Sequence, residues 1–190
     1  MAPAWRGGVS VDLMTVIHTA ISPALALLPA RMDSAAARVQ LLATGLQESL
    51  FLHRRQLVGK PPSPIGPAKS YWQGEEGGGM VHGVRLHAAT RTLAARLYRA
   101  RNVEANDTAI WNAIEFDDVL AAGLARLLLW SDPRPLPGMG DEEAAWALYL
   151  RTWRPGAYVR GTPDKQAALR AKWSVSYDAA TREVGHAGIG

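Results

Sequence analysis

The segment TGLQESLFLHRRQ, residues 44–56, places the carboxyl group of Glu48 within an apolar stretch of an expected helix. We expect this helix to run from about residue 32 to residue 53, with Asp33 or Ser34 as its N-cap. Two opposite sides of it are apolar at helical spacing, which is typical of a helix that is buried on both sides. One side carries Ala35, Val39, Leu42, Leu46 and Leu50, and the other carries Ala37, Leu41, Gly45, Glu48 and Leu52.

Glu48 is the exception on its side of this helix. A carboxyl group in apolar surroundings resists ionisation, because desolvation disfavours its charged form. Glu48 is then a candidate proton donor at neutral pH, and cleavage of a glycosidic bond requires such an acid beside the leaving oxygen. The alternative is structural: Glu48 forms a buried ion pair with Arg54 or Arg55, which are close in sequence.

The composition narrows the class of protein. A chain of 190 residues suits one compact domain, and a hydrophobic fraction of 48% can supply its core. The absence of cysteine excludes disulfides and thiolate metal sites. The net charge of +4 suits an anionic polymer such as bacterial cell wall or nucleic acid, or serves only solubility. Because the basic residues form no clustered stripe or recognition motif, we expect no specific nucleic-acid partner.

The most apolar stretch, residues 13–30, is interrupted by His18, Pro23 and Pro29, so we expect no membrane span. A poor signal peptide is one interpretation of this stretch, but Asp12 and the late start argue against it. We therefore expect no convincing signal peptide, and an N-terminal helix over about 12–28 that breaks near Pro23.

The rest of the chain alternates helical patterns with turns. Residues 57–80 are rich in proline and glycine, which excludes regular helix, and we expect a short β-hairpin around KSYWQGE at 69–75. Further helices are expected over 88–101, 106–114, 117–130, 141–153 and 163–180. We expect a single domain with an arm (1–10) and first helix in 1–33, a core over 34–156, and a C-terminal helix and Gly-rich tail over 157–190.

Four blocks follow the order of motifs in a known superfamily. Glu48, Ser49 and Phe51 match a helix end of the form Glu-Ser-x-Phe. The other matches are Gly66, Ala68 and Gln73 to a Gly-Ala-x-Gly-Leu-Met-Gln segment, Gly123 to a glycine-containing helix, and Tyr149 to an Ala-x-Ala-Tyr-Asn-x-Gly helix. From about 34 to 156 the chain resembles the lysozyme-like superfamily, especially goose-type lysozymes, soluble lytic transglycosylases and small phage or prophage proteins.

The chain departs from this pattern in three places. Ser70 stands where the family usually has glycine, Leu150 replaces the asparagine after the tyrosine, and the loop between Glu48 and Gln73 is longer. The resemblance still implies a mainly α, lysozyme-like α+β domain with a small β-hairpin and a two-lobed cleft.

The resemblance also implies a division of chemical labour. Glu48 would protonate the oxygen between N-acetylmuramic acid and N-acetylglucosamine. In a lytic transglycosylase the muramoyl 6-hydroxyl then attacks and Glu48 takes back the proton, so one carboxylate suffices. A hydrolase requires a second carboxylate to activate water. The best second candidates are Glu75 and Glu76, followed by Asp117 and Asp118; for Glu75 and Glu76 a solvated turn is the alternative.

The remaining candidates concern substrate binding and packing. Ser49, Gln73 and Tyr149 are assigned to substrate binding, the last two through hydrogen bonds to sugar N-acetyl groups. Tyr71 and Trp72 either stack on sugar rings or pack in the core. Gly45 and Gly123 are expected to permit close packing or to leave room for substrate. His82 and His87 are five residues apart, which does not place two ligands on one helix face, so we expect neither metal nor cofactor.

These observations lead to one function and one alternative. We expect cleavage of the glycan strands of peptidoglycan by a phage-type protein, located in the virion or in the host cytoplasm before delivery to the periplasm and cell wall. Its partners would be peptidoglycan and, in a virion, other virion proteins. The alternative is a structural virion protein, such as a tail or head–tail component, that keeps the fold without the activity.

Overall fold

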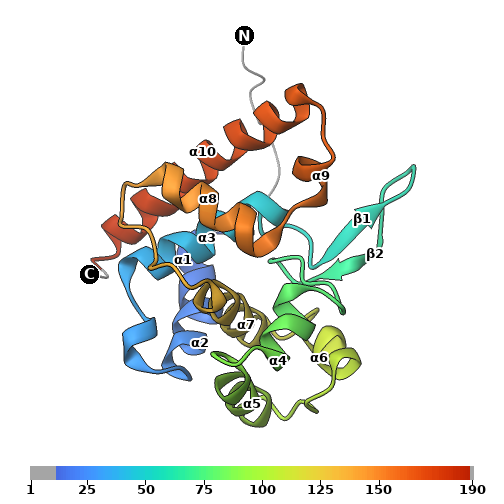
Figure 1. Cartoon of the computed structure of the whole chain (residues 1–190), viewed down its shortest axis with the longest axis vertical. Helices are drawn as coiled ribbons and strands as arrows, with labels where there is room; N and C mark the ends of the chain where they lie inside the picture. The colour runs from blue at the N-terminus through green and yellow to red at the C-terminus, as the bar shows by residue number, and fades with distance from the viewer. Residues whose placement is uncertain (1–11, 189–190) are drawn as a thin grey trace.

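Helix α3 (Ala35–Ser49) carries Glu48 and packs along the long C-terminal helix α10 (Pro163–His186) (Figure 1). The structure, a computed structural model, describes residues 12–188. Both apolar sides of α3 are buried: Val39 and Leu42 on one side and Ala37 and Leu41 on the other are all inaccessible to solvent. The expectation of a helix covered on two sides is confirmed.

The two ends of α3 are fixed by local interactions. Ser34 is the N-cap, because its side chain accepts a hydrogen bond from the amide of Ala37, while Asp33 forms an ion pair with Arg38. The helix ends at Ser49, four residues before the predicted end. Leu50 and Phe51 both have left-handed backbones, with φ of 54° and 55°, which no helix can continue.

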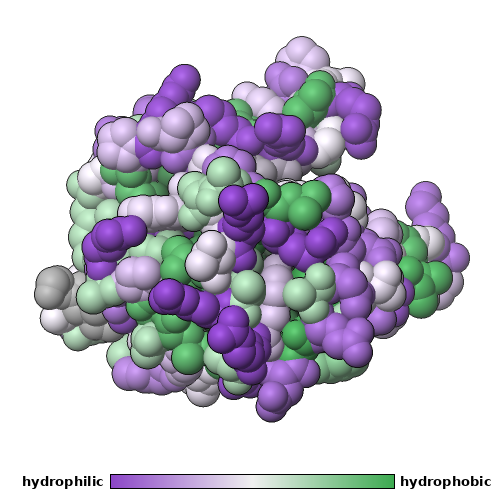
Figure 2. Space-filling view, turned by 60° about the horizontal axis from the view of Figure 1, so that its bottom comes forward, coloured by the Kyte–Doolittle hydropathy of each residue, from purple (hydrophilic) through white to green (hydrophobic). Residues whose placement is uncertain are grey.

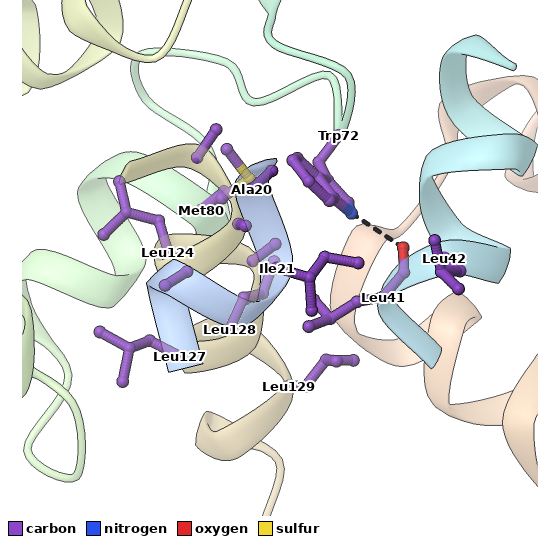
Figure 3. Packing of buried hydrophobic residues seen from close by; sticks show 14 of the residues in the cluster. Ala20, Ile21, Leu41, Leu42, Trp72, Met80, Leu124, Leu127, Leu128 and Leu129 are labelled. Carbon is purple, nitrogen blue, oxygen red and sulfur yellow. Dashed lines mark hydrogen bonds between the residues drawn. The ribbon is translucent and has the colours of Figure 1, made fainter. Parts of the chain in front are cut away.

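Helix α7 (Asp118–Ser131) forms the centre of the core. Every residue from 120 to 129 is buried, so this helix is covered on all sides. Its leucines pack against Met80 and against Ala20 and Ile21 of the N-terminal helix (Figure 3). Trp72 approaches from the other side and donates its indole N–H to the carbonyl of Leu41 at 2.9 Å (Figure 3). The core therefore joins α7, α3 and the turn that contains Trp72.

The N-terminal helix is continuous through Pro23. It consists of α1 (Leu13–Val16), the π-helical turn η1 (Ile17–Ile21) and α2 (Ser22–Ala26), and a 3₁₀ turn η2 (Ala30–Met32) follows. Pro23 is the second residue of α2 and comes directly after the π-helical turn η1, where the regular hydrogen-bond pattern is already altered. The expected helix over 12–28 is present, but the expected break near Pro23 is wrong. The predicted arm, 1–10, lies outside the described residues.

The small β-hairpin lies earlier in the chain than predicted. Strand β1 (Arg55–Val58) pairs antiparallel with β2 (Ser63–Lys69), and the pair projects from the body of the protein (Figure 1). The predicted segment, 69–75, instead forms a tight turn closed by reciprocal backbone bonds between Lys69 and Gly74. Prolines are tolerated in β2 because each strand of a two-stranded sheet has one free edge that requires no N–H donor.

The remaining helices agree with the predicted ones to within a few residues, except at the C-terminus. They are α5 (Arg91–Ala100), α6 (Asp107–Ala113), α7, α8 (Glu142–Trp153) and α10, which continues six residues past its predicted end. Four short elements are not predicted from the sequence: η2, η3 (Gly79–Gly83), α4 (Val84–Leu86) and α9 (Gly156–Val159). Within residues 12–188, no helix is both long and apolar enough to cross a membrane.

The two helical glycines have the packing role that was predicted. A Cβ atom added at Gly45 would lie 2.1 Å from Cζ of Phe51, and one at Gly123 would lie 2.8 Å from Cδ1 of Leu97. Phe51 is fully buried between the rings of Tyr71 and Trp72 and cannot move aside easily. Gly45 therefore allows the chain after α3 to fold back onto the helix.

We predict that Gly45→Ala lowers the free energy of unfolding by about 3 kcal/mol, because the added methyl group overlaps a ring in a filled core. Gly77→Ala is the matched control, since nothing lies within 4 Å of an added Cβ there. Urea unfolding followed by far-UV circular dichroism measures both variants. Equal stability of the two variants would contradict the packing role of Gly45.

Candidate active site

A pocket of about 670 Å³ opens beside the C-terminal end of α3. Its walls are formed by the end of α3, by β1 and β2, by the turn that precedes and enters η3, and by the segment 152–160 that contains α9. In the space-filling view a recess lies between the hairpin, which projects at the right, and the upper part of the molecule (Figure 2). The pocket thus brings together segments from most of the chain.

Glu48 lines this pocket, and none of the arginines among residues 12–188 forms an ion pair with it. Arg54 forms an ion pair with Asp118, and Arg55 lies 4.0 Å from Glu115 and donates to the carbonyl of Gly66. The alternative in which Glu48 pairs with one of these arginines is therefore wrong. Glu48 instead accepts a hydrogen bond of 2.6 Å from the hydroxyl of Tyr149.

Burial raises the pKa of the Glu48 carboxyl from 4.5 to about 7. The hydrogen bond from Tyr149 and the positive charge of Lys172 act in the opposite direction, and the negative charge of Glu75 adds to the increase. Glu48 is only partly buried by surface area, because one side of it faces the pocket. At neutral pH a large fraction of Glu48 is therefore protonated and within reach of a ligand.

Tyr149 is held by a stack of aromatic rings. Its ring lies 5.2 Å from that of Trp146 and 4.9 Å from that of Trp173, with both pairs inclined by 25°. Only 2% of Tyr149 is exposed, and it does not line the pocket. The predicted contact between Tyr149 and a sugar N-acetyl group is wrong for this structure, because the hydroxyl is committed to Glu48. Tyr149 is a positioning residue for that carboxyl group.

Ser49 connects the end of α3 to the turn that follows β2. Its hydroxyl donates to the carbonyl of Tyr71 at 2.8 Å and accepts from the amide of Phe51 at 3.1 Å. Ser49 borders the pocket but is nearly buried. Its hydrogen-bonding capacity is used within the protein, so the predicted role in substrate binding gives way to one in positioning the pocket wall.

Tyr71 and Trp72 pack in the core. Trp72 has no exposed surface and Tyr71 is 9% exposed, and neither lines the pocket. The Tyr71 ring is covered by Phe51 on one side, and the guanidinium of Arg54 lies 4.5 Å from its centroid. The prediction that these rings stack on sugars is therefore wrong for this structure. The alternative, that they pack in the core, is observed.

Gln73 and Glu75, which the sequence predicts as site residues, both line the pocket. Gln73 has a left-handed backbone, with φ of 53°, and its side-chain amide donates to the carbonyl of Ser70 at 2.8 Å. Glu75 is exposed to solvent. The other carboxylates considered lie elsewhere: Glu76 accepts a bond from Thr108, Asp117 caps α7, and Asp118 pairs with Arg54.

The sequence analysis missed the cationic residues of the pocket. Lys172 lies on α10 and donates to the carbonyl of Gln47, one residue before Glu48. Burial lowers the pKa of Lys172, and the charge of Glu48 opposes this shift. Arg154 and Arg160 enter from either end of α9. No spacing in the sequence links these residues to Glu48, because only the packing of α10 and α9 brings them there.

Comparison of the chain with protein-family models, with curated proteins and with solved structures gave no match. Among residues 12–188 there is no group of three or more histidine, aspartate or glutamate side chains placed to hold a metal ion. The site is thus defined by its own geometry: a half-protonated carboxyl group, its tyrosine donor and an open pocket with charges of both signs.

We predict that the contribution of Glu48 to the stability of the protein falls as pH rises from 4.5 to about 7, and that Glu48→Gln removes this loss. The folded pKa lies above the unfolded value, so ionisation of Glu48 costs more in the folded state. Relative to the wild type, Glu48→Gln should gain about 3 kcal/mol at pH 8 compared with pH 4.5.

Urea unfolding at the two pH values tests this prediction. Glu104→Gln is the control, because Glu104 is exposed and does not line the pocket. If wild type and Glu48→Gln respond to pH in parallel, the raised pKa of Glu48 is refuted.

Proposed function

We propose that the protein cleaves the glycan strands of peptidoglycan, with Glu48 as the general acid. The observation that carries this proposal is a carboxyl group with a pKa of about 7 that faces an open pocket and is held by one neutral donor, Tyr149. Such a group can donate a proton at neutral pH to a leaving glycosidic oxygen. We take the pocket as the centre of a cleft between two lobes, as in lysozyme-like folds.

Two features support the resemblance on which the substrate class rests. The first is spatial: Glu48, Gln73 and Tyr149, from three blocks far apart in sequence, meet at or next to one pocket. The second is conformational. Ser70, which stands at a glycine position of the family pattern, has a φ of 68°, in the left-handed region where glycine is the ordinary residue. Its hydroxyl accepts a bond from the amide of Trp72, which helps to offset the strain.

The proposed reaction begins with proton transfer from Glu48 to the oxygen that links muramoyl C1 to the next sugar. The C1–O bond breaks, and the leaving sugar departs with a free hydroxyl. In the transglycosylase reaction the muramoyl 6-hydroxyl forms a new bond to C1 and returns its proton to Glu48, which gives a 1,6-anhydro end. In the hydrolase reaction water attacks C1, and among residues 12–188 Glu75 is the only other carboxylate in the pocket lining that could activate it.

As the resemblance to small phage proteins implies, we propose that such an enzyme acts from a virion or is delivered from the host cytoplasm to the periplasm and cell wall. Peptidoglycan is its proposed partner. The alternative is a structural virion component that keeps the site but has lost the activity. The next experiment distinguishes this alternative from the enzyme.

We predict that Glu48→Gln lowers the rate of release of soluble glycan from purified peptidoglycan by at least about 100-fold, because amide replaces the only acid in position. Glu104→Gln should keep the wild-type rate. Mass spectrometry of the fragments identifies the reaction: 1,6-anhydro ends mean transglycosylase and reducing ends mean hydrolase. Absence of release by the wild type under all conditions would leave the structural virion component as the function.

We also predict that kcat/KM falls as pH rises through about 7, tenfold per pH unit, because only protonated Glu48 is active. A transglycosylase needs no ionised partner, so its profile should stay flat below this limb. Glu75→Gln should then keep the plateau rate and only shift the limb to lower pH, because the charge of Glu75 contributes to the raised pKa of Glu48. A hydrolase should lose activity at low pH and on Glu75→Gln. A rate that rises through pH 7 would contradict the role of Glu48 as acid.

A further inference from the structure

The pocket keeps its positive and negative groups apart. Two carboxyl groups, Glu48 and Glu75, and four cations, Arg55, Arg154, Arg160 and Lys172, share the lining. Arg55 lies 4.0 Å from Glu115, but within residues 12–188 none of the other three cations has a carboxylate oxygen within 4.0 Å. Charges of opposite sign that line one pocket without pairing leave both available to a ligand between them.

Arg154 and Arg160 bracket α9 at the rim of this pocket. Arg154 is exposed, has a left-handed backbone with φ of 48°, and donates Nε to the carbonyl of Arg151 at 3.2 Å. This bond leaves the other guanidinium N–H groups free for a ligand. The charge of Arg154 is therefore exposed in the short segment between α8 and α9.

Arg160 is oriented by a glycine. A Cβ atom added at Gly156 would lie 2.4 Å from Nη2 of Arg160, so the absence of a side chain there allows the guanidinium to fold back over the first turn of α9. This position is four residues away, on the same side of the short helix. Gly156 and Arg160 both line the pocket, and Arg160 remains exposed to solvent.

We propose that Arg154 and Arg160 bind a carboxylate group carried as a substituent on the glycan, and so orient the strand relative to Glu48. This inference rests on the proposed function. In peptidoglycan the carboxylates available next to the scissile bond are those of the peptides attached to the muramoyl lactyl group. Arginine suits this role because its planar guanidinium matches the geometry of a carboxylate. Lys172 donates a hydrogen bond to the carbonyl of Gln47, and its charge adds to the positive potential of the pocket.

The proposal is tested with soluble glycan oligomers in three forms: with peptides bearing free carboxylates, with the same peptides amidated, and with the peptides removed by an amidase. The protein variants are Arg154→Gln/Arg160→Gln and, as control, Arg91→Gln/Arg96→Gln. The control removes the same charge from two exposed arginines of α5 that do not line the pocket. Rates are measured with each protein, and affinities with each variant combined with Glu48→Gln.

For the wild type and the control we expect kcat/KM and affinity about 10-fold higher for the carboxylate-bearing oligomer than for the other two, with the difference shrinking at high salt. The pocket variant should lose this preference and keep its rate on oligomers without peptides. A preference that survives in the pocket variant, or is absent from the wild type, overturns the proposal. Turnover without any preference leaves the proposed function intact, whereas absence of both turnover and binding refutes the two together.

Discussion

The hydrogen bond from Tyr149 to Glu48 joins residues 101 positions apart and is the interaction on which the site depends. Desolvation of a carboxyl group favours its neutral form, but a neutral carboxyl group needs a fixed position to act as an acid. The aromatic cluster of Trp146, Tyr149 and Trp173 provides that position, because a buried ring packed against two tryptophans has little freedom to move its hydroxyl. The position of the Glu48 carboxyl group therefore depends on contacts among the helices α3, α8 and α10.

The chain that leaves α3 is equally constrained. Leu50 and Phe51 occupy left-handed conformations that cost free energy for residues with a side chain, and Ser70 and Gln73 do the same on the facing turn. The cost is offset by burial of Phe51 against Gly45 and by the bonds that Ser49 makes to both segments. Among residues 12–188, three of the six left-handed residues other than glycine, Leu50, Gln73 and Arg154, line the pocket, and stored strain is commonly found at such sites.

Much of this fold follows from local sequence. Apolar periodicity and caps such as Ser34 and Asp117 predict α3 and α7 because a helix depends on neighbours within four residues. The hairpin was misplaced because prolines argue against a strand, an argument that fails for strands with a free edge. Among the site residues, the apolar surroundings of Glu48 could be predicted from its own helix. The burial of Trp72 and the cationic side of the pocket could not, because they depend on contacts with segments distant in sequence.

The central claim is that the fold holds one carboxyl group half-protonated at neutral pH. The most direct measurement is an NMR titration of the side-chain carbonyl carbons of ¹³C-labelled glutamate, with the Glu48 signal assigned by its absence from Glu48→Gln. The account predicts a midpoint for Glu48 near pH 7, separate from those of exposed glutamates such as Glu104. A midpoint near the ordinary value of 4.5 would contradict it, because Glu48 would then be ionised at neutral pH and unable to donate a proton.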